Sequence, residues 1–285
     1  MQTIGGMKTA GSRQAIGVDA GGTTIKAGVV TATGGKARVN RMTIMPTPFG
    51  RNKVLDAIIT VAKRASHGRT LPVGVGFPAP FRNGKAINAP NVPCFRGVNV
   101  QKELAKRGLR CRVANDAVCA LLAELQCGRR DGNLLLLTLG TGVGGAAFVD
   151  GKITPLEPGH ARLEGKRTLE ELASAPALVR EARKRGLRVE DAKQLSAFET
   201  AGNRKARAIM LQVARRLARS IHGNCNRLKP ERVVLCGGLA NWKKLVATVK
   251  REVEAMAFAG RKPKIGVSRV KHAGIVGAAL LQERF

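Results

Sequence analysis

Acidic residues are scarce in this chain, which draws attention to Asp19 beside a glycine-rich turn. The chain has 50 Lys and Arg residues against 19 Asp and Glu residues. Asp19 ends an apolar run and is followed by Gly21-Gly22-Thr23-Thr24 and Lys26. Glycines let phosphate oxygens approach backbone N–H groups, and hydroxyl and ammonium groups add donors. The stretch predicts a phosphate-binding hairpin in which Asp19 orients Mg²⁺, with a plain Gly-Gly turn and a hydrogen-bonded acid as the alternative.

A second glycine-rich hairpin, LLLLTLGTGVGGAAFVD over residues 134–150, repeats this design. Its Gly140, Thr141 and Gly142 would place backbone amides and a hydroxyl beside a phosphate group. The run lacks the GxxxxGK[ST] pattern of the P-loop, and a strand with a turn follows it instead of the helix of a dinucleotide fingerprint. Two hairpins of one design favour a ligand that carries several phosphates.

Asn115-Asp116 stands where a predicted strand meets a predicted helix. An Asp at a helix N-terminus is most often an N-cap. One that projects from a strand end can instead accept a hydroxyl proton, which phosphoryl transfer to an alcohol requires. From the local sequence alone the cap interpretation is favoured, and the base interpretation is the alternative.

A fourth group, Glu157-Pro158-Gly159-His160, is followed by Glu164 and Glu170. A Glu and a His held in a Pro-Gly loop are suited to hydrogen bonding a polyol. A zinc site around His160 is not expected, because no other His or Cys stands at ligand spacing.

Hydrophobic periodicity predicts the elements that must position these groups. Strands are expected in three hairpins, at residues 15–30, 81–85 and 134–153, and in single runs at residues 72–80, 111–114, 232–236 and 264–270. Helices are expected at residues 53–68, 100–108, 115–128, 168–186, 190–200, 203–223, 239–256 and 273–285. Groups of strands followed by helices, twice over, predict two α/β domains of similar design.

The composition argues against several classes of protein. No apolar run of about eighteen residues exists, so no membrane span is expected, and the first residues lack the apolar core of a secretory signal. Six cysteines without a CxxC pair predict reduced, mostly buried thiols in a cytoplasmic protein. Aromatic residues make up 3% of the chain and Tyr is absent, which argues against a base-stacking platform for single-stranded nucleic acid.

The net charge of +31 is spread along the chain. Residues 1–115 hold 19 basic and 3 acidic side chains, and residues 116–285 hold 31 and 16. Such a field attracts polyanions, meaning nucleic acid, polyphosphate or an anionic membrane, and a basic surface without a dedicated partner is the alternative. The basic amphipathic run at 203–223 is interpreted as a core helix with a solvated face rather than a membrane- or RNA-binding helix.

These elements, in this order, resemble the ROK family of sugar kinases (repressors, open reading frames, kinases), members of the actin/hexokinase superfamily. The resemblance runs from Ile16 to Leu281. It rests on GVDAGGTTIKAGVV, GVGFPAPFRNGKAINAPNVP, VANDAVCALLAE, LTLGTGVGGAAFVDGKI, EPGH, TLEELASAPALVREA, PERVVLCGGLA and AGIVGAALL.

The resemblance implies an α/β fold of the two-domain actin-like ATPase (ribonuclease H-like) type, with the active-site cleft between the domains. The expected domains are residues 1–115, completed by the helix at 272–285, and residues 116–271. The implied activity is transfer of the γ-phosphoryl group of ATP, with Mg²⁺, to the 6-hydroxyl of a hexose, first of all D-glucose. We expect a cytoplasmic homodimer that makes no membrane contact and binds nucleic acid only non-specifically through its basic surface.

By the same resemblance, Asp116 is the general base for the sugar hydroxyl, and Asn115, Glu157 and His160 position the sugar. The other residues that it assigns are Asn91 and Glu170 to the sugar and Gly237 and Gly238 to adenosine. Asp19 would organise Mg²⁺ indirectly.

One departure from the family concerns its zinc motif, C-x-C-G-x-x-G-C-x-E, which follows E-x-G-H. Here that interval is ARLEGKRTLEE, shorter and without cysteine, so no zinc site is expected and the alignment of Glu170 is less secure. Polyphosphate glucokinases of the superfamily also lack this zinc site and have a comparably short loop.

Several alternatives therefore stay open. Polyphosphate could replace ATP as the donor or serve beside it, and an N-acetylhexosamine or fructose could be the acceptor. A non-catalytic polyanion-binding protein on a kinase fold is a further alternative. Because only residues 1–14 precede the first predicted strand, we expect an enzyme rather than a member of the repressor branch with its helix-turn-helix.

Overall fold

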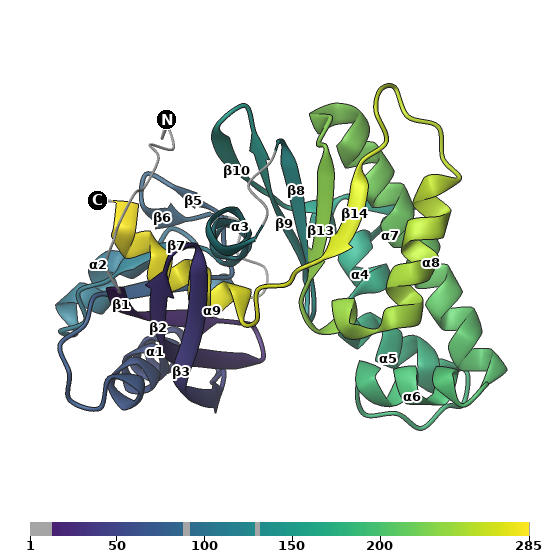
Figure 1. The fold of residues 1–285 in the computed structure, drawn as a ribbon. Helices are drawn as coiled ribbons and strands as arrows, with labels where there is room; N and C mark the ends of the chain where they lie inside the picture. Colours follow the sequence, from purple (N-terminus) through teal and green to yellow (C-terminus); the bar gives the residue numbers. More distant parts are fainter. Residues whose placement is uncertain (1–12, 88–91, 129–131, 285) are drawn as a thin grey trace. The chain divides into compact units, whose positions relative to one another are not determined.

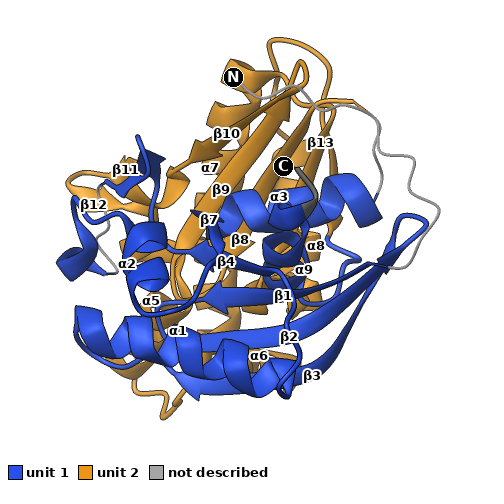
Figure 2. Cartoon of the chain, turned by 90° about the vertical axis from the view of Figure 1, so that its left-hand side faces the viewer, with its two compact units in different colours: residues 1–131, 268–285 blue, residues 132–267 orange. Residues whose placement is uncertain are grey.

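The computed structural model describes residues 13–87, 92–128 and 132–284, and it divides into two compact units (Figures 1 and 2). Unit 1 comprises residues 1–131 and 268–285, and unit 2 comprises residues 132–267. The predicted boundary differs: residues 116–131 belong to unit 1, because the helix that begins at Asp116 packs against the C-terminal helix of the same unit.

Unit 1 is built on a five-stranded mixed sheet in the order β3-β2-β1-β4-β7. β1, β2 and β3 form an antiparallel meander, and β4 and β7 continue the sheet parallel to β1. The strands are β1 (Arg13–Ala20), β2 (Thr24–Thr33), β3 (Lys36–Pro46), β4 (Val73–Phe77) and β7 (Arg112–Asn115). The helices are α1 (Arg51–Ser66), α2 (Val100–Lys106), α3 (Asp116–Cys127) and α9 (Ala273–Leu280), and a small hairpin joins β5 (Phe81–Arg82) to β6 (Lys85–Ala86).

A row of three glycines lets α9 lie directly on the sheet of unit 1. Gly28, Gly17 and Gly74 are register partners on β2, β1 and β4. A β-carbon on Gly17 or Gly74 would collide with a backbone carbonyl of α9, at Ile275 or Ala278. Because side chains alternate along a strand, Asp19 shares the face of Gly17 and lies on the same side of the sheet as α9.

Unit 2 repeats the design with a sheet in the order β10-β9-β8-β13-β14. β8, β9 and β10 form an antiparallel meander, and β13 and β14 run parallel to β8. The strands are β8 (Leu134–Leu139), β9 (Val143–Val149), β10 (Lys152–Leu156), β13 (Arg232–Cys236) and β14 (Lys264–Val267). The prediction of two α/β units of similar design agrees with this pair of sheets.

The core of unit 2 lies between alternate residues of β8 and the long helix α7, with α8 packed beside α7 (Figure 1). A hairpin of β11 (Arg162–Glu164) and β12 (Arg167–Thr168) precedes the helices. These are α4 (Leu169–Ala173), α5 (Ala175–Lys184), α6 (Ala192–Thr200), α7 (Arg204–Leu228) and α8 (Lys243–Glu254). The apolar stripe of α7 is buried in this core, as the core-helix interpretation of residues 203–223 expects.

Besides the domain boundary, three sequence-based expectations need correction. Strand β3 (Lys36–Pro46) lies in a stretch for which no strand was expected. The single helix predicted over residues 168–186 is two helices, α4 and α5, which meet at Ser174 in extended conformation. Pro176 explains the break, because proline lacks an N–H donor and is accommodated in the first turn of a new helix. The β11–β12 hairpin lies in a stretch that we expected to be a loop.

The six cysteines are free thiols. No helix among the described residues combines the length and the apolar character that crossing a membrane demands.

Candidate active site

In unit 1 the turn that follows Asp19 is held by its own backbone and by Thr47 at the end of β3. The Gly21 N–H donates to the Thr24 carbonyl (3.0 Å), and the Thr47 N–H donates to the Thr23 carbonyl (2.9 Å). The Thr47 hydroxyl donates to the Gly21 carbonyl (2.6 Å). These bonds engage three carbonyls of the turn, while Gly22 at its tip is exposed and has open space around its Cα. Thr47 is a supporting residue that the sequence did not indicate.

Asp19 lies half-buried between β2 and the first turn of α9. Lys26 is its cross-strand partner, and a β-carbon placed on Gly274 would lie 2.8 Å from the Asp19 Oδ2 atom. Burial raises the pKa of Asp19, and the positive charges of Lys26 and His272 oppose that rise. A carboxylate at a helix N-terminus is favoured by the helix dipole. Asp19 is thus a partly desolvated carboxyl group whose charged form is disfavoured by burial and stabilised by the neighbouring positive charges.

Asn115, not Asp116, is the N-cap of α3. The Asn115 side-chain oxygen accepts the Val118 N–H (3.1 Å), and Asn115 is in the extended conformation that a cap requires. Asp116 is the first helical residue, and its Oδ1 accepts the N–H of its neighbour Ala117 (2.8 Å). The local sequence favoured Asp116 as the cap. That interpretation is wrong, because the side chain of Asn115 caps the helix.

Asp19 and Asp116 lie at the same edge of the sheet. Asp19 pairs with Gly76 on β4, and Gly76 pairs with Ala114 on β7, so the carboxyl ends of three parallel strands align there. The buried thiol of Cys119 is influenced by both acids, since burial first, and then the charges of Asp116 and Asp19, raise its pKa well above the ordinary value. Such a thiol stays protonated and packs as a small apolar group. Unit 1 therefore gathers two of the predicted acids around one point.

In unit 2 the turn Gly140–Gly142 is fixed from both sides. The Gly140 N–H donates to the Gly142 carbonyl (3.0 Å), and the Ala175 N–H, at the start of α5, donates to the Gly140 carbonyl (2.8 Å). The Gly144 N–H donates to the Thr138 hydroxyl (3.1 Å). Thr141 is exposed at the tip of this turn. The break between α4 and α5 thus has a local consequence, because it brings the first N–H of α5 to the turn.

Gly237 and Gly238 directly follow β13 and lie beside this turn. Cys236, the last residue of β13, is the register partner of Thr138 on β8. Gly237 has φ of 94°, and a β-carbon there would collide with the Leu139 carbonyl, so only glycine lets β13 end so close to β8. Gly238 opens the short 3₁₀ helix η3 (Gly238–Asn241), with open space where its side chain would stand.

Glu157, His160 and Glu170 come together at the 3₁₀ helix η2 (Pro158–His160). Glu157 Oε2 lies 3.5 Å from His160 Nδ1, which is buried and has no hydrogen-bond partner among the described residues. Glu170 Oε2 accepts the Val143 N–H (2.9 Å).

Gly159 lies directly against the Val143 carbonyl, where any β-carbon would collide. This close contact keeps Glu157 and His160, on either side of Pro158-Gly159, near Glu170. They lie together although the interval between His160 and Glu170 has no zinc motif.

The pKa of Glu157 is raised by its surroundings. Burial is the main cause that raises its pKa, the nearby carboxylate of Glu170 adds to the rise, and His160 opposes it. An ionised Glu157 is therefore a costly group that would gain from a hydroxyl donor. Such a set of acceptors and a ring nitrogen is suited to binding a polyhydroxylated ligand.

Two further outcomes concern the predicted ligands. Asn91 lies outside the described residues. Within the described part of the chain, no three or more His, Cys, Asp or Glu side chains cluster as a metal-binding group.

Comparison with known proteins decides the family. The model of the ROK family matches residues 15–284. The chain belongs to the ROK family. The glucokinase of Thermotoga maritima is 32% identical over 94% of this chain and 97% of its own length.

Solved structures of similar proteins agree with the fold. The inorganic polyphosphate/ATP-glucomannokinase of Arthrobacter sp. strain KM is 28% identical and superposes with a TM-score of 0.73 over 94% of this chain and 98% of its own. A ROK family glucokinase from Streptomyces griseus, crystallised with glucose and AMPPNP, is 24% identical, with a TM-score of 0.84 over 94% of this chain and 98% of its own, and supports the fold alone. The expected α/β fold of the actin-like ATPase type is confirmed.

Proposed function

We propose that this ROK protein is an ATP-dependent hexose kinase that transfers the γ-phosphoryl group of ATP to the 6-hydroxyl of a hexose, with D-glucose the first candidate. The observation that carries the proposal is the arrangement at the start of α3. Asn115 caps the helix, so the adjacent Asp116 carboxylate is not needed as the cap.

Asp116 would accept the proton of the sugar hydroxyl as that oxygen attacks phosphorus. It has the position of a base at the carboxyl end of a parallel strand, and in unit 1 it shares the neighbourhood of Cys119 with Asp19. Phosphoryl transfer asks little covalent chemistry of the protein, so one base together with positioning and charge neutralisation is sufficient.

Asp19 fits the role of Mg²⁺ organiser. Mg²⁺ binds through one or two carboxylates together with water and substrate phosphates, and does not need an all-protein cage. Asp19 is a single carboxylate, half-buried beside Lys26 and the N-terminus of α9. When bound, the ion would neutralise charge on the transferring phosphates.

The two glycine-rich turns would bind the donor. The turns at Gly21–Thr24 and Gly140–Gly142 are each fixed by hydrogen bonds to their carbonyls, and their tips are exposed. Gly237 and Gly238, next to the second turn, would lie against adenosine. Preorganised turns of this kind lower the entropy cost of holding a flexible triphosphate.

The sugar would be held by Glu157, His160 and Glu170, with Asn115 and Asn91 completing the set. Burial raises the pKa of Glu157, so its charged form would gain from a hydrogen bond donated by a sugar hydroxyl. The assignment of Asn91 rests on the sequence motif alone. Other hexoses, N-acetylhexosamines and fructose among them, remain candidate acceptors.

The experiment is a matrix of donors and acceptors with the purified protein. ATP with Mg²⁺ and long-chain polyphosphate are each combined with glucose, mannose, N-acetylglucosamine, N-acetylmannosamine and fructose, and sugar phosphates are quantified. We expect glucose 6-phosphate from ATP. The absence of every sugar phosphate with both donors would contradict the proposal and would favour a non-catalytic polyanion-binding protein.

A polyphosphate-dependent or dual-donor glucokinase is the second candidate. The net charge of +31 favours binding of a long polyanion. The Arthrobacter relative carries both polyphosphate and ATP in its name as donors. In the same matrix, glucose 6-phosphate formed from polyphosphate without ATP would support it. Sugar phosphate formed with ATP but not with polyphosphate would exclude it.

A further inference from the structure

The β11–β12 hairpin lies in the chain between His160 and Glu170, two residues proposed to contact the sugar. The Leu169 N–H donates to the Ala161 carbonyl (3.0 Å) and closes the base of the hairpin. His160 and Glu170 are therefore the residues immediately outside this base. Whatever fixes the hairpin also fixes the separation and orientation of these two side chains.

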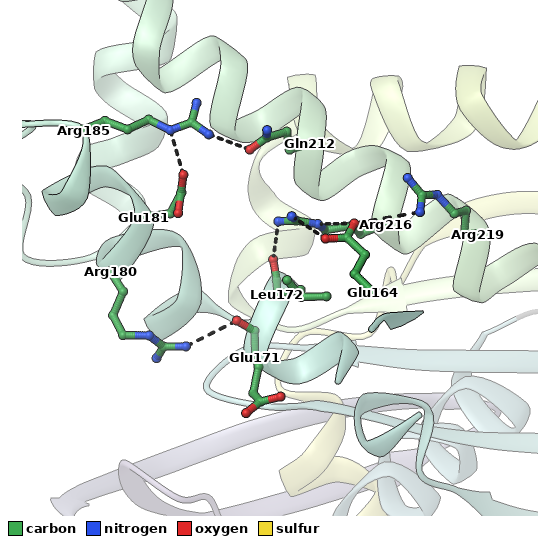
Figure 3. Close-up of polar contacts among 9 residues, drawn as sticks. All are labelled: Glu164, Glu171, Leu172, Arg180, Glu181, Arg185, Gln212, Arg216 and Arg219. Atoms are coloured by element: carbon green, nitrogen blue, oxygen red, sulfur yellow. Dashed lines mark hydrogen bonds and ion pairs between the residues drawn. The ribbon is translucent and has the colours of Figure 1, made fainter. Parts of the chain in front are cut away.

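One guanidinium group, from Arg216 on α7, fixes the hairpin (Figure 3). Arg216 Nε and Nη2 donate to the two carboxylate oxygens of Glu164, at 3.0 and 2.8 Å, in a bidentate pair. Its third nitrogen, Nη1, donates to the Leu172 carbonyl near the end of α4 (3.2 Å). Arg216 thus holds both the strand that follows His160 and the helix that carries Glu170.

The pair is partly withdrawn from water. The side chain of Arg216 is 15% exposed, whereas that of Arg219, which approaches the same Glu164 at 3.8 Å, is 52% exposed. The hydrogen bonds from Arg216 lower the pKa of Glu164, which keeps that carboxylate ionised. Bidentate Arg–carboxylate geometry adds orientation that a single ammonium group lacks.

We propose that Arg216 is a positioning residue of the sugar site, because it ties the β11–β12 hairpin and α4 to α7 and so sets where His160 and Glu170 lie. The inference rests on the hexose-kinase function proposed above. A purely stabilising ion pair is the competing explanation, and it predicts loss of protein stability without any selective effect on the sugar.

The test compares Arg216→Gln with a matched control, Arg185→Gln. Arg185 also forms an ion pair with a glutamate, Glu181 (2.8 Å), and donates to Gln212 on α7 (2.7 Å), but its bonds do not involve the hairpin (Figure 3). Its exposure and that of Glu181, 26% and 34%, resemble those of the Arg216 pair. Arg216→Lys keeps the charge without the bidentate fork.

For Arg216→Gln we expect the KM for the sugar to rise about tenfold or more, while the KM for the phosphoryl donor stays within about twofold. Arg216→Lys should recover part of the loss, and Arg185→Gln should leave both constants within about twofold of the wild type. A folded Arg216→Gln protein with an unchanged sugar KM, or with equal changes in both constants, would overturn the proposal.

A second readout separates this inference from the proposed function. Hydrogen–deuterium exchange of residues 162–168 should be faster in Arg216→Gln than in the wild type, and unchanged in Arg185→Gln. This comparison needs no turnover. If the wild type phosphorylates no sugar, the proposed function fails. Unchanged exchange of residues 162–168 in Arg216→Gln would by itself overturn the proposal that Arg216 fixes the hairpin.

Discussion

At the scale of single residues, Asn115 and Asp116 have different positions and different hydrogen bonds at the start of α3, and the proposed base depends on that difference. The sequence placed a cap and a candidate base at the same junction but could not separate them, because helix ends are uncertain by one or two residues. The structure separates them by one position, with Asn115 extended and Asp116 helical. The Asn115 side-chain oxygen accepts the Val118 N–H as the cap, and Asp116 Oδ1 accepts the neighbouring Ala117 N–H in the first turn.

This division predicts that Asn115→Ala destabilises the fold by about 1 kcal/mol, through loss of the hydrogen bond to the Val118 N–H. Asn115→Asp, which keeps a capping oxygen, should cost much less. Urea unfolding of the two variants and the wild type measures the difference. A larger loss of stability in Asp116→Ala than in Asn115→Ala would show that the cap has been assigned to the wrong residue.

The raised pKa of Glu157 predicts a stability change that depends on pH. A carboxyl group whose pKa is raised on folding contributes stability below its ordinary value of 4.5, and that contribution is lost as pH rises through the folded pKa. At neutral pH the buried charge is therefore a cost, so Glu157→Gln should be more stable than the wild type while binding sugar more weakly.

Thermal unfolding between about pH 4 and about pH 8 checks this prediction. The stability gap between Glu157→Gln and the wild type should narrow as the pH falls. A gap that does not change with pH, or a less stable variant at neutral pH, would mean that burial of the Glu157 charge is not the dominant effect.

At the scale of elements, close backbone packing explains how a segment from the end of the chain completes unit 1. The α9 helix lies against β1, β4 and α3, and it reaches each of them at a glycine: Gly17, Gly74 and Gly277. The apolar residues of α9 alone predict a buried helix, but not which elements it touches. Periodicity reports which face is buried, whereas contacts between distant segments depend on three-dimensional packing.

Gly277 therefore differs from an ordinary helical glycine. A β-carbon there would collide with the Cys119 carbonyl of α3, so Gly277→Ala should destabilise the protein by about 1–3 kcal/mol or more. Gly223 in α7 is exposed with open space around it, so Gly223→Ala should stabilise by about 0.5–1 kcal/mol. Equal effects of the two substitutions in chemical denaturation would contradict this packing.

The elements that the sequence did not predict are β3 in unit 1 and, next to the candidate sugar residues of unit 2, the β11–β12 hairpin and the break at Ser174. Both glycine-rich hairpins and the long helix α7 could be predicted from alternation and helical periodicity. The β11–β12 hairpin and the break at Ser174 could not, because strands of two or three residues carry too little pattern and a proline inside an apolar run signals a break only ambiguously. The bidentate contact of Arg216 with Glu164 joins segments far apart in the chain and left no local signal.

At the scale of the whole molecule, the net charge of +31 coexists with a few acids gathered within each of the two units. Asp19 and Asp116 in unit 1, and Glu157 and Glu170 in unit 2, are among only 19 acidic residues. The positive field raises the local concentration of phosphate-bearing substrates, and under the proposed function the few acids would supply the base, the cation ligand and the sugar acceptors.

This field predicts non-specific binding of duplex DNA and heparin that weakens steeply with salt. Binding should be lost by about 1 M salt, where the Debye length is about 3 Å, and it should show no sequence preference, because contacts to phosphates carry no sequence information. Fluorescence anisotropy across a salt series measures it. Binding that persists at high salt, or that prefers one sequence, would indicate a dedicated nucleic-acid site.

The most direct test of the account compares the wild type with Asp116→Asn, measuring the rate of glucose 6-phosphate formation from ATP and the dissociation constant for glucose. We expect turnover in the wild type and a kcat lower by about 100- to 10,000-fold in Asp116→Asn, with glucose affinity within a few-fold. A nearly normal kcat in that variant would contradict the assignment of Asp116 as the base of a hexose kinase.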